Sequence, residues 1–472
     1  MTAVQCWQHG LMANPVRNRC SPSELTEADV DAAIGRLARR DEDLSSEAQH
    51  VFDTLTWGAG PDQISQSVVQ DWLWYRVPTK YLTDEPGYMT RLAAAAADLF
   101  DELGLDAYAA VCRSPTTQGV HTAFDRSDAD GFAAMRKAMD ASGVKPPDLD
   151  DFAWGQVMGS EEAMARSAVE GALERAIATS EVVVGGRGWR AGQRAVTERS
   201  LDADHPDQPG QSWRTAVITE RVGTWVDGVS MRSETLGRLR SRVGNRLLHP
   251  VAPPPDVAER LVPLTWLLGV FGEEQSLTQA GYLNRAFLLM VHSDRPWTDP
   301  FGPDKPPRTE TDEIMLHRLR EFLESVGALR KRGRTLGRTK RGAAMATDAT
   351  LAWSVLVERF GSDPWGRFVA ETCGLLLLER AGAVPAKEAM ACVVSAASEL
   401  GWRTRGDGAR HEPTEYEVSW AFSDTRMLLE LFGMLVEHGD WADRRYELTP
   451  SGQSTLLAMI RATAAGPREQ PW

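Results

Sequence analysis

Long apolar runs are missing from this chain of 472 residues. A membrane-spanning helix requires about 20 predominantly apolar residues, and the longest candidate, Gly374 to Leu378, is far shorter. The amino-terminal residues also lack the charged stretch followed by an apolar one that marks a secretion signal. The sequence therefore predicts a cytoplasmic protein that has no membrane partner.

Cysteine is scarce, and its distribution argues against a disulfide framework. The five cysteines are Cys6, Cys20, Cys112, Cys373 and Cys392. An odd and scattered set is typical of reduced thiols in the cytosol. Cys6, His9 and Cys20 lie near one another in sequence, but no paired motif supplies the remaining ligand, so we expect no zinc site.

Catalytic signatures are also missing. The chain has no Gly-x-Ser-x-Gly motif, and its nine histidines show no metal-ligand spacing. The glycines of the run EVVVGGRGWR, which begins at Glu181, do not match a phosphate-binding or dinucleotide-binding loop. The acidic residues of 148–151 follow two prolines and are better explained by caps or a turn than by a metal. The sequence predicts no catalytic residue, metal or cofactor.

Net positive charge is lacking as well, because 66 acidic residues face 52 basic ones and the formal net charge is −14. Residues 1–250 carry −10 of this charge and residues 251–472 carry −4. This balance argues against a protein that binds polyanions over its whole surface, although a local basic patch still dominates at short range. The preference for arginine over lysine and the many alanines are typical of a bacterial genome rich in G and C.

The patterns that are present are mainly apolar residues at helical spacing. We predict a loosely ordered amino terminus over residues 1–22, a helical domain over 23–248 and a proline-rich linker over 249–256. Two winged-helix-like domains are expected to follow, over 257–360 and 361–472. The predicted fold class is mainly α, with short β-hairpin wings as the only regular strands.

Three further helical stretches are predicted from their composition and spacing. The aromatic run Trp72 to Tyr75 is interpreted as core or interface anchors. The basic helix Arg232 to Arg246 is either a second phosphate-facing surface or a partner of the acidic amino-terminal half, and we favour the pairing. A further helix is expected over Thr278 to Val291.

The chain is organised around residues 312–345. Met315, Leu319, Phe322 and Val326 recur at spacings of four, three and four, which predicts one apolar helix face. Gly327 is placed to end this helix in a left-handed conformation, and a two-stranded hairpin that turns at Gly333, residues 328–339, is expected to follow. A helix, a tight hairpin and another helix are typical of a winged helix.

The hairpin and the start of the next helix hold seven basic residues and no acidic one. These are Arg330, Lys331, Arg332, Arg334, Arg338, Lys340 and Arg341. Guanidinium groups at the tip of a two-stranded ribbon suit contact with phosphate. The alternative is a solvated basic hairpin without a ligand. We take these seven residues as the candidate nucleic-acid site.

A second copy of the pattern lies at residues 423–459. A constant shift of 110 residues aligns anchors in both copies: Leu319 with Leu429, Phe322 with Phe432, Val326 with Val436, Thr339 with Thr449 and Gly342 with Gly452. This register predicts a duplicated domain. The second hairpin is nearly neutral, so that any phosphate contact is expected at the first, while the second is suited to protein contacts such as a dimer interface.

A resemblance follows from several of these motifs. They are the run LTQAGYLNRAFL from Leu277, the helix that holds Phe322 and Val326, the basic hairpin that ends in Thr339-x-x-Gly342 and the aromatic run Trp72 to Tyr75. Together they resemble a group of uncharacterised bacterial proteins, some with an annotation derived from a plasmid open reading frame and some grouped with passenger proteins of insertion elements. The resemblance implies a mobile-element or genome-associated setting and no particular reaction. The run YELTPSG from Tyr446 is similar to the wings of many small winged-helix regulators.

Three functional interpretations follow. The first is a DNA-binding or DNA-associated protein, whose wing contacts phosphate and whose helix contacts bases. The second is a protein-interaction component, for example of a defence complex, in which the winged helices are scaffolds; a homodimer is a related alternative. The third is an enzyme with a cleft in the amino-terminal half.

Overall fold

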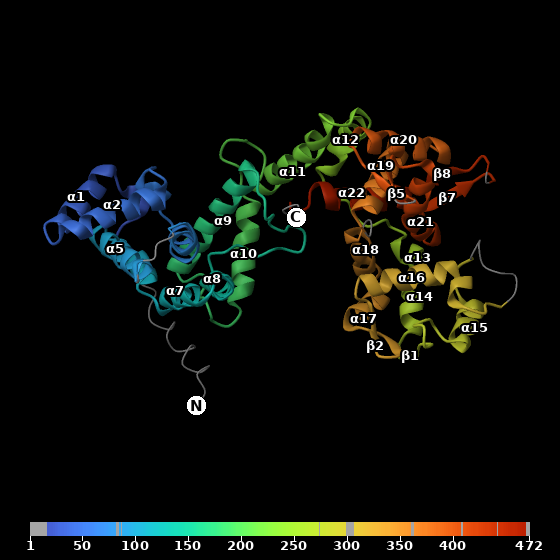
Figure 1. Cartoon of the computed structure of the whole chain (residues 1–472), viewed down its shortest axis with the longest axis horizontal. Helices are drawn as coiled ribbons and strands as arrows, with labels where there is room; N and C mark the ends of the chain where they lie inside the picture. Colours follow the sequence, from blue (N-terminus) through green and yellow to red (C-terminus); the bar gives the residue numbers. More distant parts are fainter. Residues whose placement is uncertain are drawn as a thin grey trace. The chain divides into compact units, whose positions relative to one another are not determined.

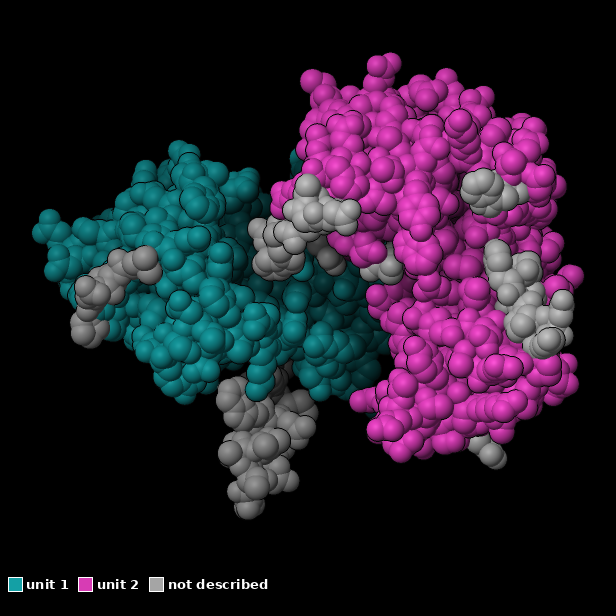
Figure 2. Space-filling model, turned by 45° about the vertical axis from the view of Figure 1, so that its right-hand side comes forward, with its two compact units in different colours: residues 1–217 teal, residues 218–472 magenta. Residues whose placement is uncertain are grey.

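The computed structural model describes residues 17–81, 85, 87–272, 274–298, 306–359, 363–406, 409–440 and 442–468. The chain forms two compact units, residues 1–217 (unit 1) and residues 218–472 (unit 2), which are coloured teal and magenta in Figure 2. The structure is mainly helical, and its sheets are small and antiparallel (Figure 1). No helix among the described residues is long and apolar enough to span a membrane.

Unit 1 is built from helices throughout its described residues, apart from one isolated bridge between Asp204 and Ser212. Its helices are α1 (Glu27–Ala38), α2 (Glu42–Thr56), α3 (Gln66–Asp71), α4 (Val77–Lys80), α5 (Tyr88–Glu102), α6 (Asp106–Cys112), α7 (Pro115–Arg126), α8 (Asp128–Ser142), α9 (Ser160–Ala178) and α10 (Trp189–Leu201). The helix α11 (Trp213–Ser230) crosses from unit 1 into unit 2.

The aromatic run at Trp72 lies in the core of unit 1, as expected. Trp72 and Trp74 are 1% and 3% exposed. Their indole nitrogens donate to the hydroxyls of Thr54 and Thr117, so neither buried N–H lacks a partner. Residues Trp72–Arg76 form a π-helical turn, a wider turn that the spacing of apolar residues did not predict.

The amino-terminal prediction is tested only in part, because residues 1–16 lie outside the described residues. Arg19 forms an ion pair with Asp106 at 3.0 Å and donates to the carbonyl oxygen of Asp101. The thiol of Cys20 lies 3.1 Å from the carbonyl oxygen of Leu103. The chain is therefore in contact with α5 and α6 from Arg19 onward.

A buried carboxylate in unit 1 gives a prediction about pH. Glu174 on α9 accepts hydrogen bonds from the hydroxyl of Tyr108 and, at 2.9 Å, from the backbone N–H of Gln66. Burial outweighs these bonds and raises the pKa of the Glu174 carboxyl above its ordinary value. The folded-state pKa is thus above that of the unfolded chain, which is about 4.3. The stability that this group contributes is fully present below the unfolded pKa and is lost as pH rises through the folded pKa.

We therefore expect the wild type to lose stability relative to Glu174→Gln as the pH rises from about 4 towards neutrality. Urea unfolding of both proteins across this pH range, monitored by hydrogen exchange in α9, measures the difference in their free energies of unfolding. Glu198→Gln, which removes an exposed carboxylate from α10, is the matched control and should leave the pH profile unchanged. A wild type that gains stability over the variant with rising pH would contradict the prediction.

Unit 2 contains two stretches with the same order of elements. The first repeat consists of α14 (Val262–Val270), β1 (Gln275–Ser276), α15 (Arg285–Asp294), α16 (Ile314–Ser325), β2 (Leu329–Arg332), β3 (Thr335–Arg338) and α17 (Lys340–Thr347). The second repeat consists of α19 (Pro364–Glu379), β4 (Val384–Pro385), α20 (Ala386–Glu399), α21 (Glu415–Leu431), β7 (Leu435–His438), β8 (Arg445–Leu448) and α22 (Pro450–Ala464). The helices α12 (Glu234–Leu247), α13 (Val257–Arg260) and α18 (Ala349–Glu358) pack on them.

The sheet topology is also the same in both repeats. Each sheet has three antiparallel strands, in the orders β1-β3-β2 and β4-β8-β7, so that the short first strand pairs with the second strand of the hairpin. The first hairpin lies where it was expected, near residues 328–340. The second was expected near residues 440–449, but its first strand, β7, already begins at Leu435. The strands β1 and β4 and the hairpin of β5 (Thr404–Gly406) and β6 (Ala409–His411) were not expected. Strands of two or three residues are too short to show an alternating pattern.

The constant register of 110 residues is wrong for the first part of the repeat. The N–H of Ala328 donates to Leu323, and the N–H of Met434 donates to Leu429, which relates positions 106 apart. Thr339 and Thr449, 110 apart, start the last helices and accept from Gly342 and Gly452.

The length of the hairpin turn explains this change of register. Two residues, 333 and 334, join β2 to β3, whereas residues 439–444 join β7 to β8. Phe322 therefore corresponds to Leu428, and Phe432 corresponds to Val326. The incorrect alignment still matched apolar with apolar residues, because four residues are about one helical turn.

Side chains support the corrected register. Arg320 and Arg426, 106 apart, are both buried and pair with Glu324 and Glu430, which are also 106 apart. A Cβ added at Gly342 or Gly452 would overlap a carbonyl oxygen, of Ala328 or Met434, at the corresponding place in each repeat.

The boundary between the units differs from the expected linker at 249–256. It lies at 217/218, because α12 packs against α19, α20 and α22 of unit 2. Arg240 forms an ion pair with Glu371 at 2.6 Å, Arg242 pairs with Glu379, and Arg246 donates to the carbonyl oxygen of Leu378. We had expected the basic helix to pair with the acidic amino-terminal half, and this was wrong. The three arginines contact α19 instead.

The helix expected over Thr278 to Val291 begins seven residues later, at Arg285, and ends at Asp294. Residues before Arg285 form β1 and a turn in which Gly281 has a φ of +86°. The Asn284 side chain accepts from the N–H of Phe287 and caps α15. This turn places Gly281 beside the hairpin of β2 and β3.

Candidate nucleic-acid interface

The hairpin of β2 and β3 is anchored on one face. Leu329 and Leu336 are buried, and their cross-strand partners are Arg338 and Lys331. Paired residues of an antiparallel ladder share a face, so Arg330 and Arg332 lie on the other side, opposite Gly337 and Thr335. Gly333 adopts a φ of +60° in the turn, a conformation that glycine takes without strain.

Six of the seven candidate residues are exposed. They are Arg330, Lys331, Arg332, Arg334, Lys340 and Arg341. Arg332 is 3.9 Å from Glu274, and Arg341 is 3.5 Å from Glu358. Exposed pairs of this kind are weak. Within the described residues, no acidic side chain forms an ion pair with the other four. The hairpin therefore presents largely uncompensated positive charge.

Arg338 does not belong to this exposed group. Its side chain is half-buried, and its guanidinium donates to the carbonyl oxygen of Leu268 at the end of α14, at 3.0 Å. A cation at a helix carboxyl terminus satisfies a backbone carbonyl that has no partner within the helix. Arg338 thus attaches the hairpin to α14, which sequence reasoning missed because Leu268 is 70 residues away.

The turn before α15 adds contacts that the sequence pattern did not reveal. A Cβ placed on Gly281 would lie 3.0 Å from the amine of Lys331, and Arg320 donates to the carbonyl oxygen of Gly281. The neighbouring Tyr282 is 40% exposed. The basic surface therefore adjoins residues 278–282.

The exposed face of α16 does not continue the basic surface. α16 packs against α21, and Arg318 forms ion pairs with Glu321 at 2.9 Å and with Asp424 of α21 at 3.4 Å. Glu321 and Ser325 are the exposed residues of its second half. We had expected base contacts from a helix, and α16 offers an acidic and partly covered face instead.

The second hairpin is neutralised by its own residues. His438 pairs with Glu447 at 2.8 Å, and Arg445 lies 3.3 Å from Asp443. Glu437 accepts from Arg426 at 2.8 Å and lies 3.0 Å from Arg444. This agrees with the nearly neutral charge read from the sequence.

A buried polar network positions α16 beneath the first hairpin. Glu310 is fully buried, accepts from the N–H of Leu283 at 2.7 Å and lies 3.0 Å from the ring of His317. Its carboxylate is also 2.7 Å from Arg320 Nε, in an ion pair without hydrogen-bond alignment. Glu313, also fully buried, pairs with His292 and Arg295. These acids lie outside any motif, so the sequence offered no signal for them.

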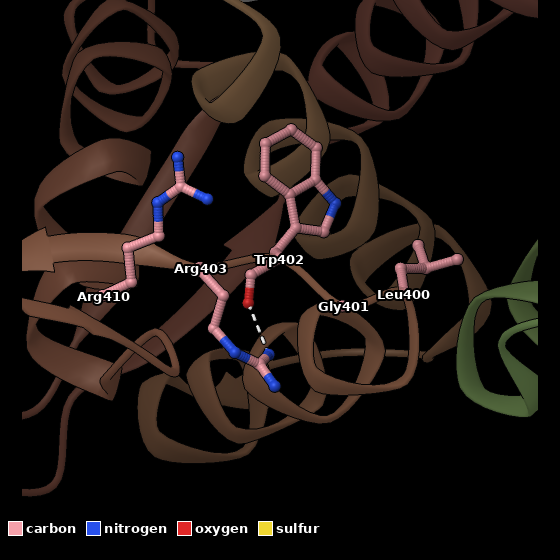
Figure 3. Close-up of a pocket in the computed structure, with 5 residues that line it drawn as sticks. All are labelled: Leu400, Gly401, Trp402, Arg403 and Arg410. Atoms are coloured by element: carbon pink, nitrogen blue, oxygen red, sulfur yellow. Dashed lines mark hydrogen bonds between the residues drawn. The ribbon is translucent and has the colours of Figure 1, made fainter.

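A cavity of about 480 Å³ lies beside the hairpin of β5 and β6, lined by Leu400, Gly401, Trp402, Arg403 and Arg410. Figure 3 shows that the two guanidinium groups point away from each other and that Arg403 turns back to the carbonyl oxygen of Trp402, to which it donates at 2.8 Å. An anion held between them would need both groups to converge. This cavity therefore does not form a two-arginine anion site.

The described residues contain no group of three or more His, Cys, Asp or Glu side chains placed to hold a metal ion. The carboxylates of 148–151 have other partners. Asp148 accepts from the N–H of Trp154, Asp150 pairs with Arg194, and Asp151 pairs with Arg214.

Comparison of the chain with protein-family models, with curated proteins and with solved structures found no match.

Proposed function

We propose that each repeat of unit 2 is a winged helix. The support is the order of a helix, a short strand, two helices and a hairpin, together with the pairing of the short strand with the second hairpin strand. The two repeats share this topology and the ion pair between a buried arginine and the glutamate four residues later. In this interpretation β2 and β3 form the first wing, and α16 is the helix that reads bases in other winged helices.

We further propose that the first wing binds the phosphate backbone of duplex DNA. The single observation that carries this proposal is the set of six exposed basic residues on one hairpin and the following helix start, of which two have only weak ion pairs. Lys and Arg side chains that neutralise phosphates supply most of the affinity for any DNA sequence. A mobile-element or genome-associated setting would suit such an activity.

The proposed binding is independent of DNA sequence. Base recognition requires side chains that reach base edges in a groove, and α16 packs against α21 and exposes Glu321. The phosphates of DNA would repel the carboxylate of Glu321 on this face of α16. We therefore propose that the wing contacts the phosphate backbone of the DNA and that α16 does not contact the bases.

Replacing Arg332 and Arg334 with alanine is expected to weaken binding to two unrelated duplexes by the same factor. The slope of log affinity against log salt should become less steep by about 0.9 for each lost phosphate contact. Fluorescence anisotropy of labelled duplexes over a range of salt concentrations measures both quantities. The free energy of unfolding should change by less than about 0.5 kcal/mol, because both side chains are exposed.

Arg445→Ala is the matched control, since Arg445 lies in the second hairpin and pairs with Asp443. It should leave the affinity and the salt slope unchanged. Absence of duplex binding at low salt would exclude the proposal. A different loss of affinity for the two duplexes would show that bases are read.

The alternative, a protein-interaction component, is favoured by one specific observation. Pairing of α16 with α21 uses the helix faces that would otherwise be free for DNA. In that function the first wing binds an acidic protein surface. A folded wild-type protein that binds no duplex at low salt, where phosphate contacts are strongest, would support it.

A further inference from the structure

A second cleft in unit 2 combines aromatic and acidic side chains. It has a volume of about 590 Å³ and lies where α16, α21, β5 and the start of α19 meet. Trp365, Tyr416 and Trp420 form its aromatic part. Among the described side chains, Asp363, Glu417 and Asp424 line it together with one cation, Arg318. We call these seven residues the aromatic cleft.

Two of the aromatic side chains are unusually open to solvent. Tyr416 is 78% exposed and Trp420 is 68% exposed. They lie four residues apart on α21, so that they share one face of the helix. Exposed aromatic residues beside a concave surface are typical of binding sites, where Trp and Tyr contribute much of the binding energy.

Tyr416 belongs to a part of α21 that has no counterpart in the first repeat, and Trp420 lies at its edge. With the register of 106 residues, Trp420 corresponds to Ile314, the first residue of α16. Residues 415–419 are therefore an added amino-terminal turn, which projects Tyr416 beyond the shared fold. Val418 packs this addition onto the core, whereas Tyr416 and Ser419 are exposed.

The carboxylates of the cleft are held in place by the fold. Asp363 caps α19 through the N–H groups of Trp365 and Gly366, and Glu417 accepts from the N–H and hydroxyl of Thr414. Asp424 is 3.4 Å from Arg318. Burial nevertheless raises the pKa of the Asp424 carboxyl, so a further cation nearby would stabilise its charged form.

We propose that the aromatic cleft binds an arginine-containing peptide segment of a partner protein. A guanidinium group stacks on Trp or Tyr and also pairs with carboxylates. The described side chains that line the cleft include three carboxylates and one cation. Nucleic acid is disfavoured by the same charges. The volume suits a few side chains of an extended segment. This inference is independent of the proposed DNA binding, since it uses none of the wing residues.

The test uses the full chain and a fluorescein-labelled peptide of eight residues in which arginine and leucine alternate. Anisotropy is expected to show saturable binding of one peptide per chain. Trp420→Ala and Asp424→Asn should each weaken it at least tenfold. A peptide with glutamate in place of arginine should not bind, and a lysine peptide should bind more weakly, because an ammonium group cannot stack as a plane.

Trp57→Ala is the matched control, because it removes a tryptophan that is 81% exposed in unit 1. It should leave peptide binding unchanged, and circular dichroism should confirm that all variants fold. Absence of saturable binding, or equal binding by the wild type and Trp420→Ala, would overturn the proposal. So would sedimentation that shows a dimer disrupted by Trp420→Ala but not by the peptide, since a second copy would then occupy the cleft.

Discussion

Truncating Phe322 to alanine is expected to lower the free energy of unfolding of unit 2 by about 3–5 kcal/mol. Phe322 is 8% exposed and belongs to the hydrophobic core of this unit. Its removal leaves a cavity between α16 and its neighbours that a close-packed interior fills only in part. Denaturant unfolding of the full chain, with hydrogen exchange in residues 262–347 as the local measurement, tests this value.

Tyr416→Ala provides the comparison, since it removes an aromatic ring that is 78% exposed. It should change the free energy of unfolding by less than about 0.5 kcal/mol. Similar effects of the two substitutions would mean that Phe322 is not a packed core residue. The core position of Phe322 does not depend on the alignment with Phe432, which the corrected register excludes.

Replacing Glu310 with alanine is expected to be about as costly, at roughly 3–5 kcal/mol, because it removes one partner of a buried ion pair. Arg320, whose side chain is 10% exposed, would then lose the carboxylate 2.7 Å from its Nε. The N–H of Leu283 would also lose its acceptor. Chemical denaturation with hydrogen exchange in α15 and α16 measures the loss.

Glu310→Gln separates charge from packing, since glutamine retains the volume and one acceptor oxygen. It should cost less than Glu310→Ala. Glu321→Ala is the matched control for an exposed pair, because Glu321 and Arg318 are 47% and 30% exposed, and it should cost less than about 1 kcal/mol. A Glu310→Ala protein as stable as Glu321→Ala would show that the buried network does not hold α16.

Local features of the fold were predictable where one short stretch contains the whole cause. Gly327 ends α16 with a φ of +70°, and Gly333 turns the first hairpin, because both positions need a backbone conformation that other residues adopt at a cost. Thr339 and Thr449 cap the last helix of each repeat through their own side chains. Six of the seven basic residues are exposed, as an uninterrupted run of charge predicts.

The predictions failed where the deciding contact is distant in sequence. Periodicity could not separate a shift of 106 residues from one of 110. The two shifts differ by about one helical turn, so both align apolar positions with apolar positions. The hydrogen bonds of Ala328 and Met434 and the ion pairs of Arg320 and Arg426 distinguish the two registers. The charge of Arg240 predicted an ion pair but not its partner, which is Glu371.

The sequence by itself determined the helical class, the two hairpins and the basic charge of the first, since helix periodicity, turn glycines and charge are properties of neighbouring residues. The tertiary structure alone decided which charges are free. It fixed Arg338 to α14, covered α16 with α21 and brought Trp365 to Tyr416 and Trp420 in one cleft. Exposure and partner choice depend on which elements pack together, and packing joins residues that no local pattern relates.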